Sequence, residues 1–477
     1  MTRKDTAAFN DPDPVERLID LILQTRYEDL PPEAVAAATV FFLDTVGVAC
    51  AGKLAPQLAE LTRVSARWGD APTHGPTIWN TGVRTSAPVA ALINGYQCHA
   101  LEYDCVYEEG VILPAAPILA AMMAKVEELT SRGRPPTGAQ LIRAFTVALE
   151  VSCTLAAAAR SAMFFFRPAT TGVFSALAAL ACLDPLSRDQ LRYAFGIGYS
   201  QVCGPMQAHE EGSMMLAMQM GFAARNAIQA HDLAGVGITA PVQILGGRFG
   251  FFHNFEREAA LDEVLPAMGR PWKVTRLSHK PFPSGRVTHG VIHAMRGLRQ
   301  SLGITPGNAL QRIRSVSVLL PPLGMRLVGR PMVHRPAPNY ARLCIPFVAA
   351  AEVLYGGVDP STFVPERLNA PEVEALARRV RTAEKPHPNP NAFYPQTLTL
   401  ELDDGQAITC EIPYAWGHPQ MPLTAGERED KFRLCWRLTR DRTPANEARM
   451  EATLDWLRNL PDQPDAGLLI ELLSTTP

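Results

Sequence analysis

The sequence predicts a mainly α protein, with a large all-α helical domain and a smaller α+β domain. Three observations support this prediction. Of the 477 residues, 47% are hydrophobic, which is enough for a large core. A chain of this length exceeds what one core usually supports, so two domains are expected. Helical periodicity fills the first 270 residues, whereas strand-like alternation is found only after about residue 270.

Helical periodicity begins at residues 14–24, after 13 residues interpreted as a frayed terminus. It restarts after Pro31 and Pro32 as residues 34–51, a run that is apolar on most faces and therefore predicts a central helix of a bundle. The predicted helices of this first part are rich in alanine, and this small side chain allows close contacts between helices. The helical domain is placed at residues 1–270, and its further helices are expected at 55–68, 86–101, 114–130, 137–159, 169–183, 187–202 and 212–233.

The pattern changes near Pro271, where the α+β domain is predicted to begin. Alternation predicts strands at 311–320 and, less regularly, at 272–277, and a helix is expected at 287–302. Residues 339–355 and 371–380 are predicted to be helical, and residues 396–402 and 407–412 to form a hairpin. This domain is placed at 271–413. Helices at 428–438, 446–460 and 466–473 are expected to pack back on the helical domain, which residues 414–477 would complete.

Composition and charge indicate which partners are not expected and which cellular compartment is. The formal net charge of −2 provides no basic footprint for nucleic acid. The longest apolar runs, 111–124 and 168–183, are interrupted by proline or too short to cross a bilayer, so no membrane association is expected. The nine cysteines form no C-x-x-C pair, and no signal peptide precedes them. They are interpreted as buried thiols in a reducing, cytoplasmic compartment.

Six short motifs follow one another in a fixed order: 42–49 (FLDTVGVA), 94–104 (NGYQCHALEYD), 167–172 (RPATTG), 211–225 (from EGSM to GFAAR), 246–251 (GGRFGF) and 280–283 (KPFP). Together they resemble the MmgE/PrpD family, which includes 2-methylcitrate dehydratase, cis-aconitate decarboxylase and iminodisuccinate epimerase. The resemblance covers roughly residues 14–440. It implies a helical domain closed by C-terminal helices, a lid domain, a homodimer and a small-molecule pocket between the domains. It implies no metal and no organic cofactor.

The chain departs from the family at positions that carry chemistry. Lys280 is retained, followed by Arg286 and His289. The family's aspartate corresponds to Glu102, two of its histidines to Leu113 and Arg167, and a lysine, a third histidine and a tyrosine to Leu216, Gln219 and Leu327 respectively. Met214, Met215, Met218 and Met220 add to an expected apolar wall. A tricarboxylate needs several cations or donors to offset its desolvation, so this pocket is expected to prefer a larger and less charged substrate.

The remaining polar residues suit proton transfer beside a carbonyl. Glu102 can act as a general base or acid if burial raises its pKa. Lys280, on a proline-stiffened segment before a helix, can protonate a leaving group or hold an enolate, and Arg167 can clamp a carboxylate. Asp104 and His209 are further candidates for the site. His289 and His293 have the spacing of a metal pair but lack a third ligand nearby, so no metal site is predicted.

The expected function is a cofactor-independent, lyase-like enzyme. It would dehydrate or rearrange a relatively large carbonyl or carboxylate compound, in a setting such as secondary metabolism. Turnover of 2-methylcitrate or cis-aconitate is disfavoured by the lost polar residues. Two alternatives stay open. One is a cyclase or isomerase, including a pericyclase, on a polyketide-like substrate, for which the shape of the pocket matters most. The other is an inactive homologue that only binds.

Overall fold

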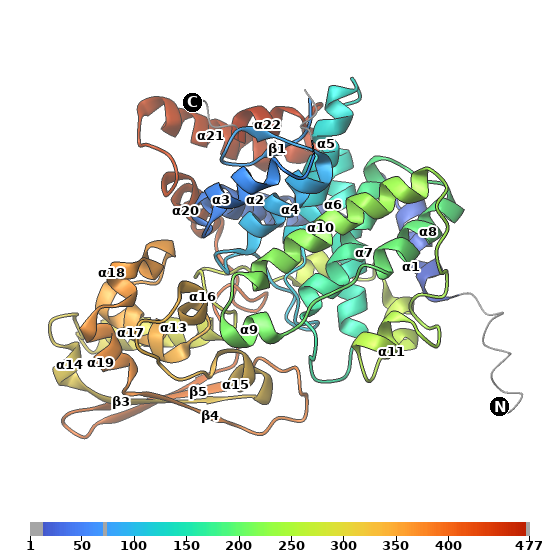
Figure 1. Ribbon diagram of the computed structural model, residues 1–477. Helices are drawn as coiled ribbons and strands as arrows, with labels where there is room; N and C mark the ends of the chain where they lie inside the picture. Colours follow the sequence, from blue (N-terminus) through green and yellow to red (C-terminus); the bar gives the residue numbers. More distant parts are fainter. Residues whose placement is uncertain (1–12, 70–73, 474–477) are drawn as a thin grey trace, which may run out of the picture.

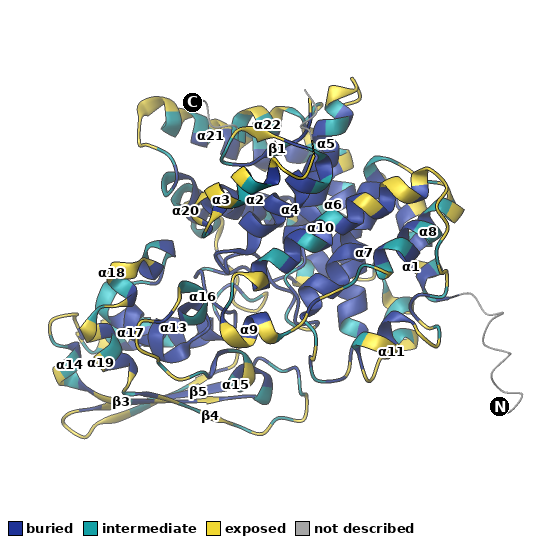
Figure 2. Cartoon of the chain, in the orientation of Figure 1, coloured by how far each residue is buried: buried dark blue, intermediate teal, exposed yellow. Residues whose placement is uncertain are grey.

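The computed structural model describes residues 13–69 and 74–473. Its first part is a layered bundle of helices, which we call the body (Figure 1). As predicted, most of the long helices are rich in alanine and buried on most faces, so they form the core rather than cover it (Figure 2). The longer helices are α1 (Val15–Gln24), α2 (Pro32–Ala51), α4 (Ala87–His99), α5 (Ala115–Ser131), α6 (Gly138–Ala158), α7 (Arg167–Leu183), α8 (Arg188–Tyr199) and α10 (Met215–Gly235). Of these, α1 and α8 are amphipathic.

Two glycines allow the closest contact between these helices. At the crossing of α4 and α10, a Cβ atom on Gly221 would lie 2.0 Å from the Leu92 carbonyl oxygen, and one on Gly95 would lie 2.8 Å from the Gly221 Cα. Neither position accepts a side chain without moving backbone. This contact fixes the C-terminal end of α4, from which the loop that carries Glu102 leaves the bundle.

The α+β part, residues 288–412, forms a four-stranded sheet with helices on one face, which we call the lid (Figure 1). The strand order is β4-β3-β5-β6, with β3 parallel to β4 and antiparallel to β5. Val316, Val318 and Leu320 of β3 are buried while their neighbours are more exposed, so one face of the sheet is covered; α17 contacts β4, and α13 contacts β5 and β6. The elements are β3 (Ile313–Leu320), β4 (Val380–Glu384), β5 (Gln396–Leu402), β6 (Ala407–Ile412), α13 (Thr288–Ser301) and α17 (Ile345–Tyr355).

Several element predictions for this region were wrong. Residues 272–277 contain a 3₁₀ helix, η5 (Lys273–Arg276), and no strand. The single helix predicted over 339–355 is two helices, α16 (Pro338–Arg342) and α17, because Cys344 is extended and Pro346, in the first turn of α17, has no N–H to continue a helix from α16. β4 lies at the edge of the sheet and begins at Val380, the residue at which the predicted helix 371–380 ends. In the body, the two-residue strands β1 (Thr77–Ile78) and β2 (Val83–Arg84) were also missed.

The C-terminal helices α20 (Ala425–Arg437) and α21 (Pro444–Arg458) return to the body and contact α2. Lys431 Nζ lies 2.8 Å from Asp44 Oδ1 and donates to the Tyr103 carbonyl oxygen at 2.9 Å. α22 (Leu468–Leu473) packs on α21. The predicted domain boundaries themselves stay a prediction.

Two helical stretches, Pro32–Leu54 and Gly138–Ala158, are long and apolar enough to cross a membrane by length and composition. Within this fold, 78% and 89% of their most apolar windows are buried. Their hydrophobicity is therefore accounted for by their place in the core. Of the nine cysteines, all are free thiols; seven are buried, Cys410 is partly buried and Cys203 is exposed.

Candidate active site

A small cavity of about 60 Å³ lies between the body and the lid. Glu102 enters it from the loop after α4, and Lys280 from the segment before α13. Leu113, His209, Arg286 and Leu327 line the same cavity, so the structure brings six of the predicted site residues together. The remaining lining residues are almost all apolar: Val106, Val111, Ile112, Met163, Phe166, Pro168, Gly285, Val287, Val328, Leu343 and Phe393.

The backbone just before Lys280 is hydrogen-bonded to two other segments. Ser278 exchanges backbone hydrogen bonds with Val106 at 2.7 and 2.9 Å, and the His279 N–H donates to the Gly417 carbonyl oxygen at 2.9 Å. The prolines that follow prevent helix formation until Thr288. Lys280 therefore extends from a segment that joins the body, the lid and the C-terminal region. We call this segment, residues 278–287, the strap.

Lys280 and Glu102 form a buried ion pair. Lys280 Nζ donates to Glu102 Oε2 at 2.8 Å and to the Glu102 carbonyl oxygen at 3.3 Å. The two side chains are 1% and 11% exposed, so water screens the pair little. Glu102 has a φ of +52°, an unusual backbone conformation for this residue type. Such local strain is common where a side chain is held for function.

The expectation that burial raises the pKa of Glu102 was wrong in its net result. Burial does favour the neutral acid, but the charges of Lys280 and His99 and the hydrogen bond from Lys280 outweigh it and lower the pKa to about 2. Glu102 is therefore a carboxylate in this state. In this state it has no proton to donate, and its neighbours lower its affinity for one.

Asp104 does not line the cavity, although the sequence placed it among the substrate-binding residues. It lies behind Glu102, where its carboxylate accepts from His99 Nδ1 at 2.9 and 3.1 Å. His99 Nε2 in turn lies 3.4 Å from Glu102 Oε1. The sequence analysis missed His99. A signal was present, since His99, Glu102 and Asp104 crowd three polar groups into the end of a buried helix.

Arg286 and His289 are occupied within the protein. Arg286 Nε lies 2.6 Å from Glu108 Oε1, and Nη1 donates to the Trp416 carbonyl oxygen at 2.8 Å. His289 does not line the cavity; its Nε2 lies 3.2 Å from the Ser284 carbonyl oxygen. Burial and the charges of Arg286 and Lys280 hold its pKa well below the usual value, so the ring is neutral. The contacts of both residues therefore hold the strap around Lys280 in place.

Arg167 is engaged elsewhere, which removes the basis for its predicted role as a substrate clamp. Its Nε and Nη2 donate to Glu256 at 2.7 and 2.9 Å, and Nη2 also donates to the Ser161 carbonyl oxygen at 2.7 Å. Both charged side chains are at least 96% buried. Arg167 begins α7, and only its neighbours Phe166 and Pro168 reach the cavity.

Leu216 and Gln219 of α10 lie outside the cavity lining. Leu216 packs into the core, and Gln219 Nε2 donates to the Pro205 carbonyl oxygen at 3.3 Å. The expected methionine wall is also absent from this cavity. Met214 and Met215 are 42% and 45% exposed, and neither they nor Met220 line it. The apolar lining comes instead from the α7 segment, the loop after α4 and the lid.

His209 faces Arg330, a lid residue that the sequence analysis did not single out. Arg330 Nη2 donates to the His209 carbonyl oxygen at 3.0 Å and lies 3.4 Å from its Nδ1. Burial and the charge of Arg330 lower the pKa of His209 to about 4, so the ring is neutral. Arg330 Nη1 is buried without a hydrogen-bond acceptor among the described residues. This free N–H, next to the cavity-lining His209, can donate to an anionic group of a ligand.

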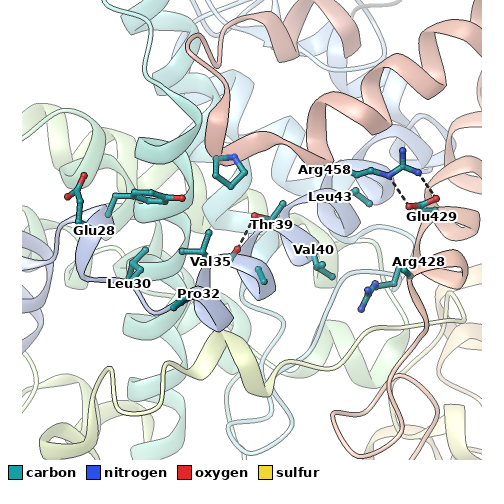
Figure 3. Close-up of a pocket in the computed structure, with 14 residues that line it drawn as sticks. Glu28, Leu30, Pro32, Val35, Thr39, Val40, Leu43, Arg428, Glu429 and Arg458 are labelled. Carbon is teal, nitrogen blue, oxygen red and sulfur yellow. Dashed lines mark hydrogen bonds and ion pairs between the residues drawn. The ribbon is translucent and has the colours of Figure 1, made fainter.

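A larger hollow of about 710 Å³ lies elsewhere, along the exposed face of α2 beside α20 and α21 (Figure 3). Its floor is apolar, with Val35, Val40 and Leu43, and its rim carries the ion pair of Arg458 with Glu429 at 2.6 Å. It contains none of the predicted site residues. We place the site in the smaller cavity because its ion pair of Lys280 and Glu102 is buried, whereas the ion pair at the rim of the larger hollow is open to solvent. Across the described residues, no group of three or more His, Cys, Asp or Glu is arranged to hold a metal ion.

Comparison with known proteins agrees with this organisation. The model of the MmgE/PrpD N-terminal domain matches residues 16–263, and that of the MmgE/PrpD C-terminal domain matches residues 282–459. The chain is 26% identical to cis-aconitate decarboxylase of Mus musculus, over 90% of this chain and 87% of that protein. It is 27% identical to the Homo sapiens protein of the same name (83% and 82% covered) and 25% identical to that of Aspergillus terreus (94% and 93%). With both domain models matched over most of its length, the chain belongs to the MmgE/PrpD family.

Proposed function

We propose that the protein is a lyase that moves a proton beside a carbonyl or carboxylate group, and that its substrate is less charged than cis-aconitate. The observation that carries this proposal is the buried pair of Lys280 and Glu102, enclosed by an otherwise apolar cavity. Related cis-aconitate decarboxylases support the reaction class. Dehydration and proton-transfer rearrangement both fit this pair, and secondary metabolism is a suitable setting.

The cavity favours an apolar substrate body with one anionic group. Leu113 and Leu327 occupy lining positions where a tricarboxylate would need cations or donors. Arg286 is already paired with Glu108, and Arg167 with Glu256. Arg330 forms no ion pair with a carboxylate among the described residues and its Nη1 has no acceptor, so it is the better anchor for a single carboxylate. A charge-assisted hydrogen bond from Nη1 to the substrate carboxylate would also help to fix the orientation of the substrate.

In the reaction, Lys280 is the acid and Glu102 the base. When the ammonium group of Lys280 turns towards a substrate oxygen, Glu102 loses the largest charge that lowers its pKa. Its proton affinity then rises, because burial favours the neutral acid. The carboxylate takes the proton from the carbon beside the carbonyl. The Lys280 ammonium stabilises the enolate oxygen or gives its proton to the leaving group.

Substrate entry requires the lid to move. A volume of about 60 Å³ is far below the ~300–1,000 Å³ of common ligand pockets. The cavity is closed by contacts across the gap: Arg330 with the His209 carbonyl oxygen, and Asn391 Nδ2 with the Ser161 carbonyl oxygen at 2.9 Å. The structure thus corresponds to a closed state, and the size of the substrate is set by how far the lid opens.

A ligand panel tests the proposal. Purified protein is heated with cis-aconitate, 2-methylcitrate and a series of apolar keto and hydroxy monocarboxylic acids, and ligands that raise the melting temperature are followed for turnover by NMR. Stabilisation by the apolar acids and conversion of at least one of them supports the proposal. Rapid conversion of cis-aconitate or 2-methylcitrate would refute it. Binding without any conversion would favour the inactive, ligand-binding alternative, and ring closure without elimination would favour the cyclase.

A further inference from the structure

Four buried polar side chains form a continuous line from the cavity into the body. Lys280 Nζ lies 2.8 Å from Glu102 Oε2, His99 Nε2 lies 3.4 Å from Glu102 Oε1, and His99 Nδ1 lies 2.9 Å from Asp104 Oδ1. His99 and Asp104 are 1% and 0% exposed. The proposed reaction uses Lys280 and Glu102 and leaves the inner pair without a role.

We propose that His99, held by Asp104, is a positioning residue whose imidazolium aims the Glu102 carboxylate into the cavity and stays opposite it when Lys280 turns to the substrate. This inference rests on the proposed function and gives His99 and Asp104 a role in it. Without His99, an ionised Glu102 would have no charged group in direct contact at the moment when Lys280 leaves, since Arg330 and Arg342 act on it without forming an ion pair, and such burial is costly. With His99, a full positive charge remains behind it.

The geometry supports an imidazolium. The Asp104 carboxylate accepts at Nδ1, so that nitrogen carries a proton. Nε2 faces a second carboxylate and has no other partner among the described residues, so a proton there is favoured too. Burial and the Lys280 charge oppose this, but Asp104 and Glu102 outweigh them and raise the pKa of His99. The Phe166 ring, 5.8 Å away between ring centroids, adds no charge.

The 3.4 Å separation of His99 Nε2 from Glu102 Oε1 is longer than a good hydrogen bond. In this state Glu102 is drawn towards Lys280, whose contact is shorter. When Lys280 turns away, the Glu102 carboxylate is free to close on His99. The same imidazolium also limits how far the pKa of Glu102 rises. His99 therefore sets the pH range in which Glu102 works as a base.

The first test is a histidine titration without substrate. Protein labelled with ¹³C and ¹⁵N in its 11 histidines is titrated by NMR from about pH 5 to about pH 9, with His99 assigned by its loss in His99→Gln. We expect wild-type His99 to titrate above the ordinary histidine value. Asp104→Asn is expected to move the titration down by about one pH unit or more. Glu109→Gln, which changes a partly exposed carboxylate on the same loop, is the matched control and is expected to change nothing.

A wild-type His99 that titrates at or below the ordinary value overturns the proposal, even if Asp104→Asn does not fold. A titration unmoved by Asp104→Asn overturns it as well. Because no substrate is used, these results do not depend on whether the proposed function is right.

The second test uses the substrate found by the ligand panel. In His99→Gln, the acid limb of the kcat profile, which reports the enzyme–substrate complex in which Lys280 has turned away, is expected to move to higher pH by about one unit, because Glu102 loses the cation that lowers its pKa. A merely structural histidine would lower kcat at every pH and leave the limb in place, and that outcome would contradict the proposal.

Discussion

Replacing Lys280 with methionine tests the electrostatics of the site most fully. The side chain keeps a similar length but loses its charge, which leaves an ionised Glu102 buried with His99 as its remaining partner. The pKa of Glu102 lies at about 2, compared with 4.5 for an unperturbed glutamate. At ~1.4 kcal/mol per pKa unit, this arrangement is worth about 3 kcal/mol to the folded state. Losses of ~3–5 kcal/mol are usual when one partner of a buried pair is removed.

The pH dependence follows from the sign of the pKa change. The folded-state pKa of Glu102 is lowered, so its contribution in the wild type is complete above pH 4.5 and is lost as the pH falls towards about 2. In Lys280→Met the pKa of Glu102 rises with burial, and protonation relieves the unpaired charge. The stability gap to the wild type is therefore wide near pH ~8 and narrower near pH ~5.

Urea denaturation at both pH values, followed by circular dichroism, measures this gap. The double variant Glu102→Gln/Lys280→Met is the control, because it removes both charges and is expected to recover more than half of the loss. If Lys280→Met is as stable as the wild type near pH ~8, the reasoning fails. It also fails if the loss is the same at both pH values and Glu102→Gln does not reduce it.

Three further predictions concern other parts of the chain. Gly221→Ala places a Cβ against the Leu92 backbone and should lower the free energy of unfolding by more than about 2 kcal/mol, whereas Gly297→Ala, with nothing within 4 Å, should raise it by ~0.5–1. Arg167→Met strands the buried Glu256 and should cost ~3–5 kcal/mol, against less than about 1 for Arg160→Ala in an exposed pair; equal losses would contradict the assignment of a buried pair. Of the nine cysteines, Cys203 is the exposed one, so one thiol per chain is expected to react rapidly with a thiol reagent. If a rapid reaction persists in Cys203→Ser, another cysteine is accessible and the prediction is wrong.

The sequence was most informative where a physical pattern was long and local. Periodic apolar runs of 10 to 21 residues, the longer ones rich in alanine, predicted the helices of the body, because periodicity over several turns is hard to mimic by chance. Short elements failed. β4 is a five-residue edge strand with one buried position, which has too little alternation to be distinguished from the end of a helix. The split between α16 and α17 depends on the extended Cys344, and Pro346 was its only local sign.

The candidate site followed the same rule. Motif order was enough to bring Glu102, Lys280, Leu113 and Leu327 to one cavity. The errors concern pairings between distant residues: Glu256 lies 89 positions from Arg167 and occupies its guanidinium. The net pKa of Glu102 could not be predicted either, since burial alone gives the wrong sign. His99 was visible in the sequence, but its position between two carboxylates depends on how the loop after α4 folds back.

Proton exchange at carbon tests the central claim most directly. The best-stabilising acid from the ligand panel is incubated with the protein in ²H₂O, and exchange of the hydrogen beside its carbonyl is followed by ¹H NMR. The account predicts exchange with the wild type and a loss of at least about 100-fold in both Lys280→Met and Glu102→Gln, the usual effect of removing an acid or base. Exchange at the wild-type rate in either variant would contradict it.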